Sequence, residues 1–270
     1  MTEPLRGDPP GPSSPPDNLP TVVAIALVAY VTADIAHHAF GHGLMCWLED
    51  GQIELLSSVF VRCSRTGLAI DLGGPCANLV VGLIAALALR VTRRMSVSTE
   101  LFLILLAGFN LMWFSIHLVF SVLTDSDDWA WLLHVFNGAP VVRYALVGVG
   151  ALVYVLAVRY LRIRMAHFAR PPVRARLIVV AAWLTAGAIA CATALFDPRG
   201  IGAVWNKALP QSMLLSIGLL SLPSRARQLV PPPEGYPAIG ISRGWMVAAV
   251  VLSVLSVVFL GPGVRLERPW

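Results

Sequence analysis

The sequence predicts an all-α fold: a polytopic membrane bundle of about six to seven transmembrane helices. Of its 270 residues, 57% are hydrophobic and only 13% are charged, about half the charged share of roughly 25% in an ordinary soluble domain. The mean hydropathy is +0.73. The apolar residues gather in runs of about 20, the length that spans a bilayer as a helix. Inside lipid a helix satisfies all of its own backbone polar groups, which favours helices over open strands.

This composition excludes a soluble globular enzyme, a disordered chain and a disulfide-rich secreted module. The net charge of +5 does not indicate nucleic acid as a partner, because Lys207 is the sole lysine and no lysine-rich arm exists. The lipid bilayer is the partner that the composition predicts.

The chain divides into three parts. Residues 1–20 are rich in Pro, Gly, Ser and Asp and lack the basic and apolar regions of a signal peptide, so they predict a disordered Pro-rich tail. Residues 21–136 hold the first three spans and nearly all of the unusual polar residues. Residues 137–270 hold the additional transmembrane helices.

Seven apolar runs are candidate spans, and the sixth is the weakest because it contains Pro210, Gln211 and four serines. Without that run the count is six. The candidate spans are Thr21–Leu48, Leu72–Leu89, Leu101–Thr124, Tyr144–Val158, Leu177–Phe196, Ala208–Ser224 and Gly244–Val264.

The basic residues predict the orientation in the membrane. Arginines gather between spans two and three, four and five, and six and seven, and such loops are cytoplasmic by the positive-inside rule. With Arg6 in the tail, this orientation gives a multi-pass protein of the cell membrane with a cytoplasmic N-terminus. The arginines of these loops are Arg90, Arg93, Arg94, Arg159, Arg162, Arg164, Arg170, Arg174, Arg176, Arg225, Arg227 and Arg243.

The first span carries an unusual cluster of ionisable residues: Asp34, His37, His38 and His42. Ionisable residues inside a span are costly, so each one indicates a functional site. Residues four apart lie about 40° from each other around an α-helix, so His38 and His42 share one face and can bind one metal ion. His37 lies about 100° away from that face and is less well placed.

A third ligand is expected from another segment. If the spans alternate in direction, the end of the first, the start of the second and the end of the third meet at one side of the membrane. That side collects the acidic loop Asp125–Asp128 beside the histidines. Two histidines and a carboxylate are typical of a zinc site with an open fourth position. Asn110 and His117 lie on one face of the third span; Asn110 is expected to join helices, and His117 is a further candidate ligand.

These residues resemble the site-2 protease family of intramembrane zinc metallopeptidases. In that family HExGH lies in the first core helix, a GP-x-x-N element opens the second, and an Asp near the third completes the metal site. Here Pro75 and Asn78 match GP-x-x-N, and Asp128, which precedes Trp129, is the preferred match for the third ligand, with Asp125 next. The resemblance covers roughly residues 21–136. It implies zinc held by His38, His42 and Asp128, and a transmembrane segment of another protein as substrate.

The general-base Glu of the family motif is missing from this chain. If His38 and His42 are the histidine pair, Ala39 stands at the position of Glu. A second registration aligns His37 and His38 with the His-Glu pair and inserts one residue before Gly41-His42, so that His38 stands there. Loss of a general base typically slows proton transfer 10²–10⁴-fold. The chain is therefore metallopeptidase-like with its activity open: an active protease, or a degenerate or repurposed pseudoprotease.

Asp34 is a catalytic candidate, because it lies one turn before His38 and either substitutes for the missing base or orients that histidine. His37 and His38 are further candidates for the base. Two other classes of function stay open: a haem-binding membrane protein, and a metal-free scaffold or transporter. Cys46, Cys63 and Cys76 all fall on the predicted outer side, where disulfides form. The sequence leaves the pairing among them open.

Overall fold

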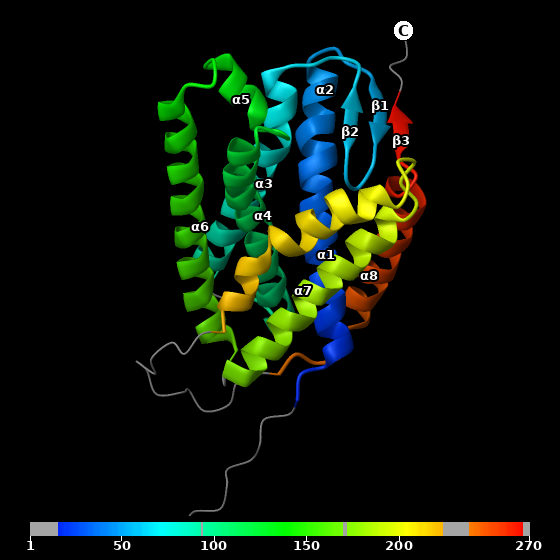
Figure 1. The fold of residues 1–270 in the computed structure, drawn as a ribbon. Coiled ribbons are helices and arrows are strands. Elements are labelled where there is room, and N and C mark those ends of the chain that lie inside the picture. Colours follow the sequence, from blue (N-terminus) through cyan, green and yellow to red (C-terminus); the bar gives the residue numbers. More distant parts are fainter. Residues whose placement is uncertain (1–15, 93, 170–171, 224–237, 267–270) are drawn as a thin grey trace, which may run out of the picture.

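The structure, a computed structural model, describes residues 16–92, 94–169, 172–223 and 238–266. It is a helical bundle with a small sheet at one end (Figure 1). Among the described residues, six helices are long and apolar enough to cross a membrane, which confirms the predicted all-α membrane bundle. They are α1 with η1 and α2 (Leu19–Leu48), α3 (Leu68–Val91), α4 (Val97–Thr124), α6 (Pro140–Phe168), α7 (Pro172–Ala194) and α8 with η5 (Arg243–Leu260).

Some residues used for the sequence predictions lie outside the described ones. They are residues 1–15 of the predicted tail and the arginines Arg6, Arg93, Arg170, Arg225 and Arg227. The described end of the tail is ordered: α1 begins at Leu19, inside the segment predicted to be disordered, and the Asn18 side chain caps it by accepting a hydrogen bond from the Thr21 amide at 3.0 Å.

The first long helix changes its winding partway through the membrane. It is α-helical over α1 (Leu19–Ile35), π-helical over η1 (Ala36–Gly43), and α-helical again over α2 (Leu44–Leu48). Single π-turns inside α-helices are rare and are frequent at functional sites. This one coincides with the histidine cluster of the sequence.

Helix α4 lies at the centre of the bundle and α6 and α8 lie at its periphery. In the most apolar stretch of α4, 78% of the residues are buried, against 17% in α6 and 11% in α8. Because lipid is as apolar as the protein interior, exposed Val and Leu side chains on α6 and α8 fit lipid contact. Functional polar groups are therefore expected in the interior, where α1, α3 and α4 meet.

The predicted span Ala208–Ser224 is a set of short helical turns: η2 (Val204–Ala208), η3 (Pro210–Leu214) and η4 (Ile217–Ser221). It still crosses the bundle (Figure 1). Asp197, after α7, bonds Ser57 at the sheet end, whereas Ile239, before α8, bonds Asn18 at the other end. Pro210 explains the broken winding, since proline removes one helical hydrogen bond and clashes with the preceding turn.

A three-stranded antiparallel sheet, which the sequence did not predict, covers one end of the bundle. Its strands are β1 (Ile53–Leu56), β2 (Val61–Cys63) and β3 (Val264–Leu266), in the order β2-β1-β3. The short helix α5 (Ala130–Val135) lies at the same end (Figure 1).

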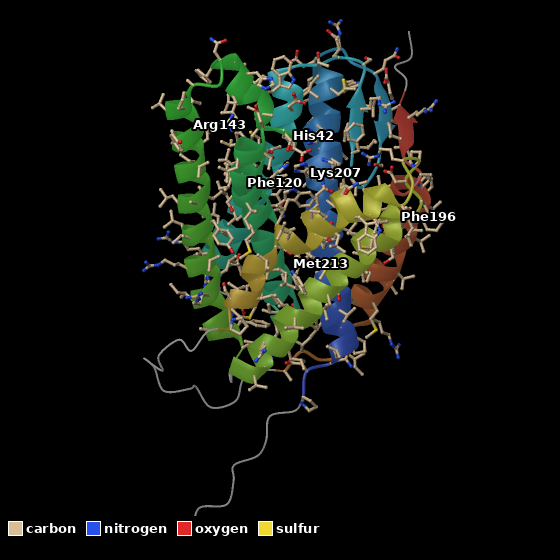
Figure 2. All side chains as sticks on the ribbon, in the orientation of Figure 1. His42, Phe120, Arg143, Phe196, Lys207 and Met213 are labelled. Carbon is tan, nitrogen blue, oxygen red and sulfur yellow. A yellow bond between two sulfur atoms is a disulfide. The ribbon has the colours of Figure 1, made fainter. Side chains whose placement is uncertain are left out.

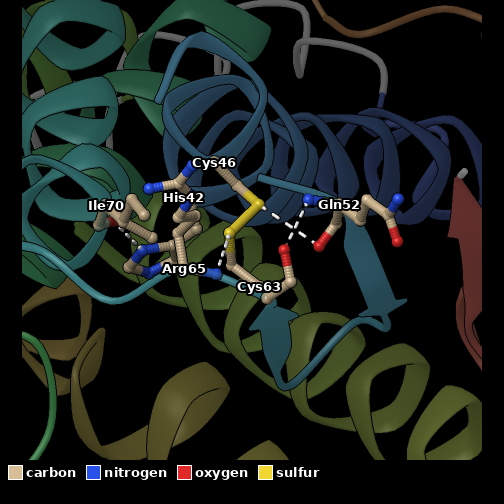
Figure 3. The surroundings of a disulfide bond; sticks show 7 residues. His42, Cys46, Gln52, Cys63, Arg65 and Ile70 are labelled. Atoms are coloured by element: carbon tan, nitrogen blue, oxygen red, sulfur yellow. Dashed lines mark hydrogen bonds between the residues drawn. A yellow bond between two sulfur atoms is a disulfide. The ribbon is translucent and has the colours of Figure 1, made fainter. Parts of the chain in front are cut away.

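A disulfide joins Cys46 in α2 to Cys63 in β2, and Cys76 is free and exposed (Figure 3). Of the pairings that the sequence left open, the structure thus contains this one. The bond ties strand β2 to the helix one turn beyond His42. Strand β2 forms one wall of the cavity described below.

Asp197 ties the β1–β2 connection to the end of α7. Its carboxylate accepts a hydrogen bond from the Ser57 hydroxyl at 2.9 Å and is paired with the Arg199 guanidinium at 2.8 Å. Burial alone would raise the pKa of Asp197, but hydrogen bonds from Arg199 and Ser57 together with the charge of Arg199 lower it below its ordinary value.

We expect Asp197→Asn to lower the free energy of unfolding by about 2 kcal/mol near neutral pH, because hydrogen bonds to charged groups contribute roughly 1.5–3 kcal/mol. A lowered pKa stabilises the folded state above the ordinary carboxylate value of 3.8, and this contribution is lost as the pH falls through the lowered value. Thermal unfolding of the variant and the parent in detergent from pH 3 to 8 measures this contribution to stability. An equal difference between variant and parent at every pH would contradict this account.

Candidate metal centre

Three side chains from two distant segments converge in the half of the bundle nearest the sheet. His37 and His42 come from η1, and Asp128 comes from the connection between α4 and α5. The two Nε2 atoms lie 3.1 Å apart, and each is 3.4 Å from Oδ2 of Asp128. Both histidines are buried. This group could hold a metal ion.

The π-turn explains why His37, and not the predicted His38, joins His42 and Asp128. In an α-helix, residues five apart lie about 140° from each other. Hydrogen bonding from i to i+5 adds a residue to the turn and brings residues five apart onto one face. The prediction from spacing assumed α-helical winding throughout, and therefore paired His38 with His42.

A chain of amide hydrogen bonds sets the tautomer of His37. The Asn110 amide nitrogen donates to the Leu106 carbonyl at 2.8 Å, so its oxygen accepts from the Asn78 amide nitrogen, also at 2.8 Å. The Asn78 oxygen then accepts from Nδ1 of His37 at 2.5 Å. Nδ1 is thus the protonated nitrogen, and Nε2 presents a lone pair to the cluster.

His42 has the same tautomer for a different reason. Its Nδ1 donates to the Ile70 carbonyl of α3 at 2.7 Å (Figure 3), which leaves a lone pair on Nε2. Oδ2 of Asp128 is buried and has no hydrogen-bond partner among the described residues. Three acceptors therefore face one another, and like dipoles this close repel each other unless a cation lies between them.

The spacing of these acceptors fits zinc. Zinc–nitrogen bonds are about 2.0–2.1 Å, so neighbouring ligand atoms of a tetrahedron lie about 3.3–3.4 Å apart. The observed separations of 3.1, 3.4 and 3.4 Å agree with this value. A single shared proton would satisfy one pair of acceptors, whereas a divalent cation satisfies all three.

Glycines let the backbone of α3 lie directly against the cluster. A Cβ atom at Gly74 would stand 2.3 Å from Nε2 of His42 and 2.8 Å from Nε2 of His37. A Cβ atom at Gly41 would stand 2.4 Å from the Gly74 Cα. Any side chain at either position would displace the two histidines or separate the helices.

The acidic loop provides one ligand and two anchors. Asp125 lies near His134 and Arg143, at 3.5 and 3.7 Å, and Asp127 is paired with Lys207 of η2. Of the three, Asp128 faces His37 and His42.

His38 and Asp34 form a second pair beside the metal cluster. Nδ1 of His38 lies 3.2 Å from both the Asp34 carboxylate and the Asp34 carbonyl oxygen. His38 lines the cavity next to the cluster, whereas Asp34 does not. Asp34, the catalytic candidate of the sequence, thus contacts His38 and does not itself line the cavity. Ala39 packs instead among the apolar residues around Cys46 and Ile53.

A cavity of about 370 Å³ opens on the cluster from the sheet end. Strand β2, the start of α3, the acidic loop and η2–η3 form its walls. His42, Lys207 and the surrounding elements are seen in Figure 2. The charged residues that line it are Asp71, Asp127 and Asp128 on one hand, and Arg62, Arg65 and Lys207 on the other.

Two further groups surround the cluster. Nδ1 of His117 lies 3.4 Å from Oδ2 of Asp128, yet it is not among the three converging ligand atoms. The Trp113 ring stacks on His37, with centroids 4.7 Å apart and planes at 19°. Sequence reasoning named His117 but missed Trp113, because a tryptophan in an apolar span is ordinary and carries no signal.

Comparison of the chain with models of known protein families, with curated proteins and with solved structures found no match.

Proposed function

We propose that this chain is a membrane-embedded zinc protein built on the plan of a site-2-type metallopeptidase, with the carboxylate of the general base absent. The observation that carries the proposal is the set of three mutually facing acceptors, whose lone pairs a divalent cation satisfies. Two imidazoles and one carboxylate are a zinc donor set with an open fourth position.

The chain's own residues supply positioning. Asn78 and Ile70 fix the two imidazoles in the metal-binding tautomer. The cavity is large enough to admit part of a peptide segment and is reached from the sheet end. Bound zinc would polarise a carbonyl group and lower the pKa of water. A transmembrane segment of another protein is the occupant that the resemblance implies.

The π-turn supports the second registration of the family motif. His37 then matches the first histidine of HExGH, His38 stands at the position of Glu, and Gly41-His42 matches the end of the motif. His38 borders the cavity, as a residue at that position should, whereas Ala39 does not. An imidazole there lacks the carboxylate oxygens of Glu, so we expect zinc binding to persist and hydrolysis to be slow.

Two features support a cytoplasmic N-terminus. Asp17 before α1 pairs with Arg174 at the start of α7, at the end of the bundle opposite the sheet, where the described arginines of the predicted cytoplasmic loops also occur. The disulfide lies at the sheet end, and disulfides persist in oxidising compartments. The cavity would then open on the outer side of the membrane.

Haem held between His37 and His42 is disfavoured by the geometry. Two axial histidines stand on opposite faces of a haem, one on each side of the iron, whereas the two Nε2 atoms here lie 3.1 Å apart and point at a common position with Asp128.

We expect the full chain, purified in detergent, to bind about one zinc per molecule, as a site with three protein ligands requires. Elemental analysis and titration with zinc alone test this. His134→Ala is the matched control, because this exposed histidine lies outside the cluster and its loss should leave the zinc content unchanged. A Soret band would favour haem, and a chain that binds neither zinc nor haem would favour a scaffold or transporter.

A further inference from the structure

The connection between α4 and α5 is held in an unusual backbone conformation. Asp125 and Asp127 both have positive φ angles, 53° and 61°, in the left-handed region that non-glycine residues rarely adopt. Such residues cost roughly 1–3 kcal/mol each and persist only when the surroundings hold them. Among the described residues, Asp128 is the one proposed metal ligand outside η1, and its position depends on what holds this connection.

Among the described residues, the Asp128 side chain itself does little to fix the connection between α4 and α5. Oδ2 of Asp128 has no hydrogen bond, and the backbone bonds of the loop run from the Asp125 and Ser126 amides to the Ser121 carbonyl and from the Ala130 amide to the Asp127 carbonyl. The flanking aspartates make the ion pairs of the loop, and the Ser126 hydroxyl bonds that of the neighbouring Thr124. Asp125 contacts Arg143 and His134, both of which follow the loop closely in sequence.

Besides the approach of Asp128 to the histidines, Asp127 makes a long-range side-chain contact of the loop. Its carboxylate is paired with the ammonium group of Lys207, 80 residues away on η2. Lys207 is the sole lysine of the chain, and it stands on the irregular crossing that walls the cavity. Its charge also offsets the repulsion between the neighbouring carboxylates of Asp127, Asp128 and Asp71.

We propose that Lys207 and Asp127 are a positioning pair that holds the Asp128 carboxylate on His37 and His42, so that the crossing η2–η4 controls metal affinity without supplying a ligand. This inference rests on the proposed zinc site. Partners that orient metal ligands typically change metal affinity 10–100-fold when removed.

The test is a zinc titration of the full chain in detergent. We expect Lys207→Met and Asp127→Asn each to weaken zinc binding about 10–100-fold. Lys207→Arg, which keeps the charge, should stay within about threefold of the parent. The exchange of the two charges, Lys207→Asp with Asp127→Lys, should recover most of the affinity that either reversal alone removes.

A purely structural role is separated by two readouts. The thermal midpoint of the zinc-free Lys207→Met variant should match that of the parent, and only the increase on adding zinc should shrink. Arg174→Met breaks a comparable pair with Asp17 at the opposite end of the bundle, and its zinc affinity should equal that of the parent.

The outcomes are distinct. The positioning role is overturned, while the zinc site stands, if Lys207→Met leaves the zinc affinity unchanged. It is also overturned if Lys207→Arg loses as much zinc affinity as Lys207→Met. A parent chain that binds no zinc overturns the proposed function and this inference with it.

Discussion

His37→Ala is expected to abolish stoichiometric zinc binding, whereas His38→Ala keeps it. His37 offers its Nε2 lone pair to the cluster, while Nδ1 of His38 faces Asp34. Loss of a ligand should exceed the 10–100-fold that loss of a ligand's partner typically causes, so we expect a reduction of more than about 100-fold for His37→Ala. Zinc content after gel filtration and competition with a chelator of known affinity measure both variants.

The pair of variants is matched, because each removes one buried imidazole from neighbouring positions of the same π-turn. The α-helical interpretation of the sequence predicts the reverse ranking. A chain that loses zinc on His38→Ala and retains it on His37→Ala would therefore show that His38 and His42 bind the metal and that η1 is wound as an α-helix.

His38→Glu is expected to raise peptide hydrolysis by about 10²-fold or more, since a positioned general base typically contributes 10²–10⁴-fold. The new carboxylate would stand at the cavity beside the metal cluster, where the resembled family carries its Glu. The assay uses zinc-loaded chain and a hydrophobic reporter helix with a quenched fluorophore pair flanking a central Gly-Asn. Rates are compared with those of the parent.

Ala39→Glu is the control. It tests the other alignment of the motif, in which Ala39 stands at the position of Glu. Ala39 packs around Cys46 and Ile53, away from the cavity, so a Glu there buries a charge among apolar residues and should destabilise the chain without adding activity. A second control, His38→Gln, has the shape of Glu without its charge. A gain of activity in Ala39→Glu but not in His38→Glu would refute the registration that we infer from the π-turn.

Composition and run length were sufficient to predict the class of fold, because a 57% hydrophobic chain can bury such runs only in lipid. Six of the seven runs form long helices, and the weak sixth run forms short helical turns. The sequence could not predict how the sixth run is wound. Pro210 indicates a break in the helix, but the division into η2, η3 and η4 depends on packing against α6 and α7.

The sheet escaped prediction for a physical reason. Strands β1 and β2 are four and three residues long, and β3 follows directly after a membrane helix. Strands so short have no clear alternation of polar and apolar residues, and the pairing of β1 with β3 joins segments about 200 residues apart. Only the tertiary structure brings Ile53 beside Leu266.

The candidate site was partly predictable. Asp128 and His42 were named from the sequence, and the approach of the glycine-rich start of α3 followed from alternating span directions. His37 was passed over because its angle was calculated for an α-helix. Asn78 was matched to the family motif, but its bond to His37 could not be inferred without knowing which histidine faces it.

The π-turn also has a consequence for how relatives of this chain are recognised. Phe40 lies within the turn with 67% of its surface exposed, and contributes nothing to the cluster. Omitting it leaves the order His37-His38-Ala39-Gly41-His42, a five-residue motif with its histidines at the ordinary separation. Under the proposed function, these six residues would be the resembled motif enlarged by one residue with an exposed side chain. A search pattern that requires three residues between the two histidines passes over such chains, and a pattern that allows four finds them.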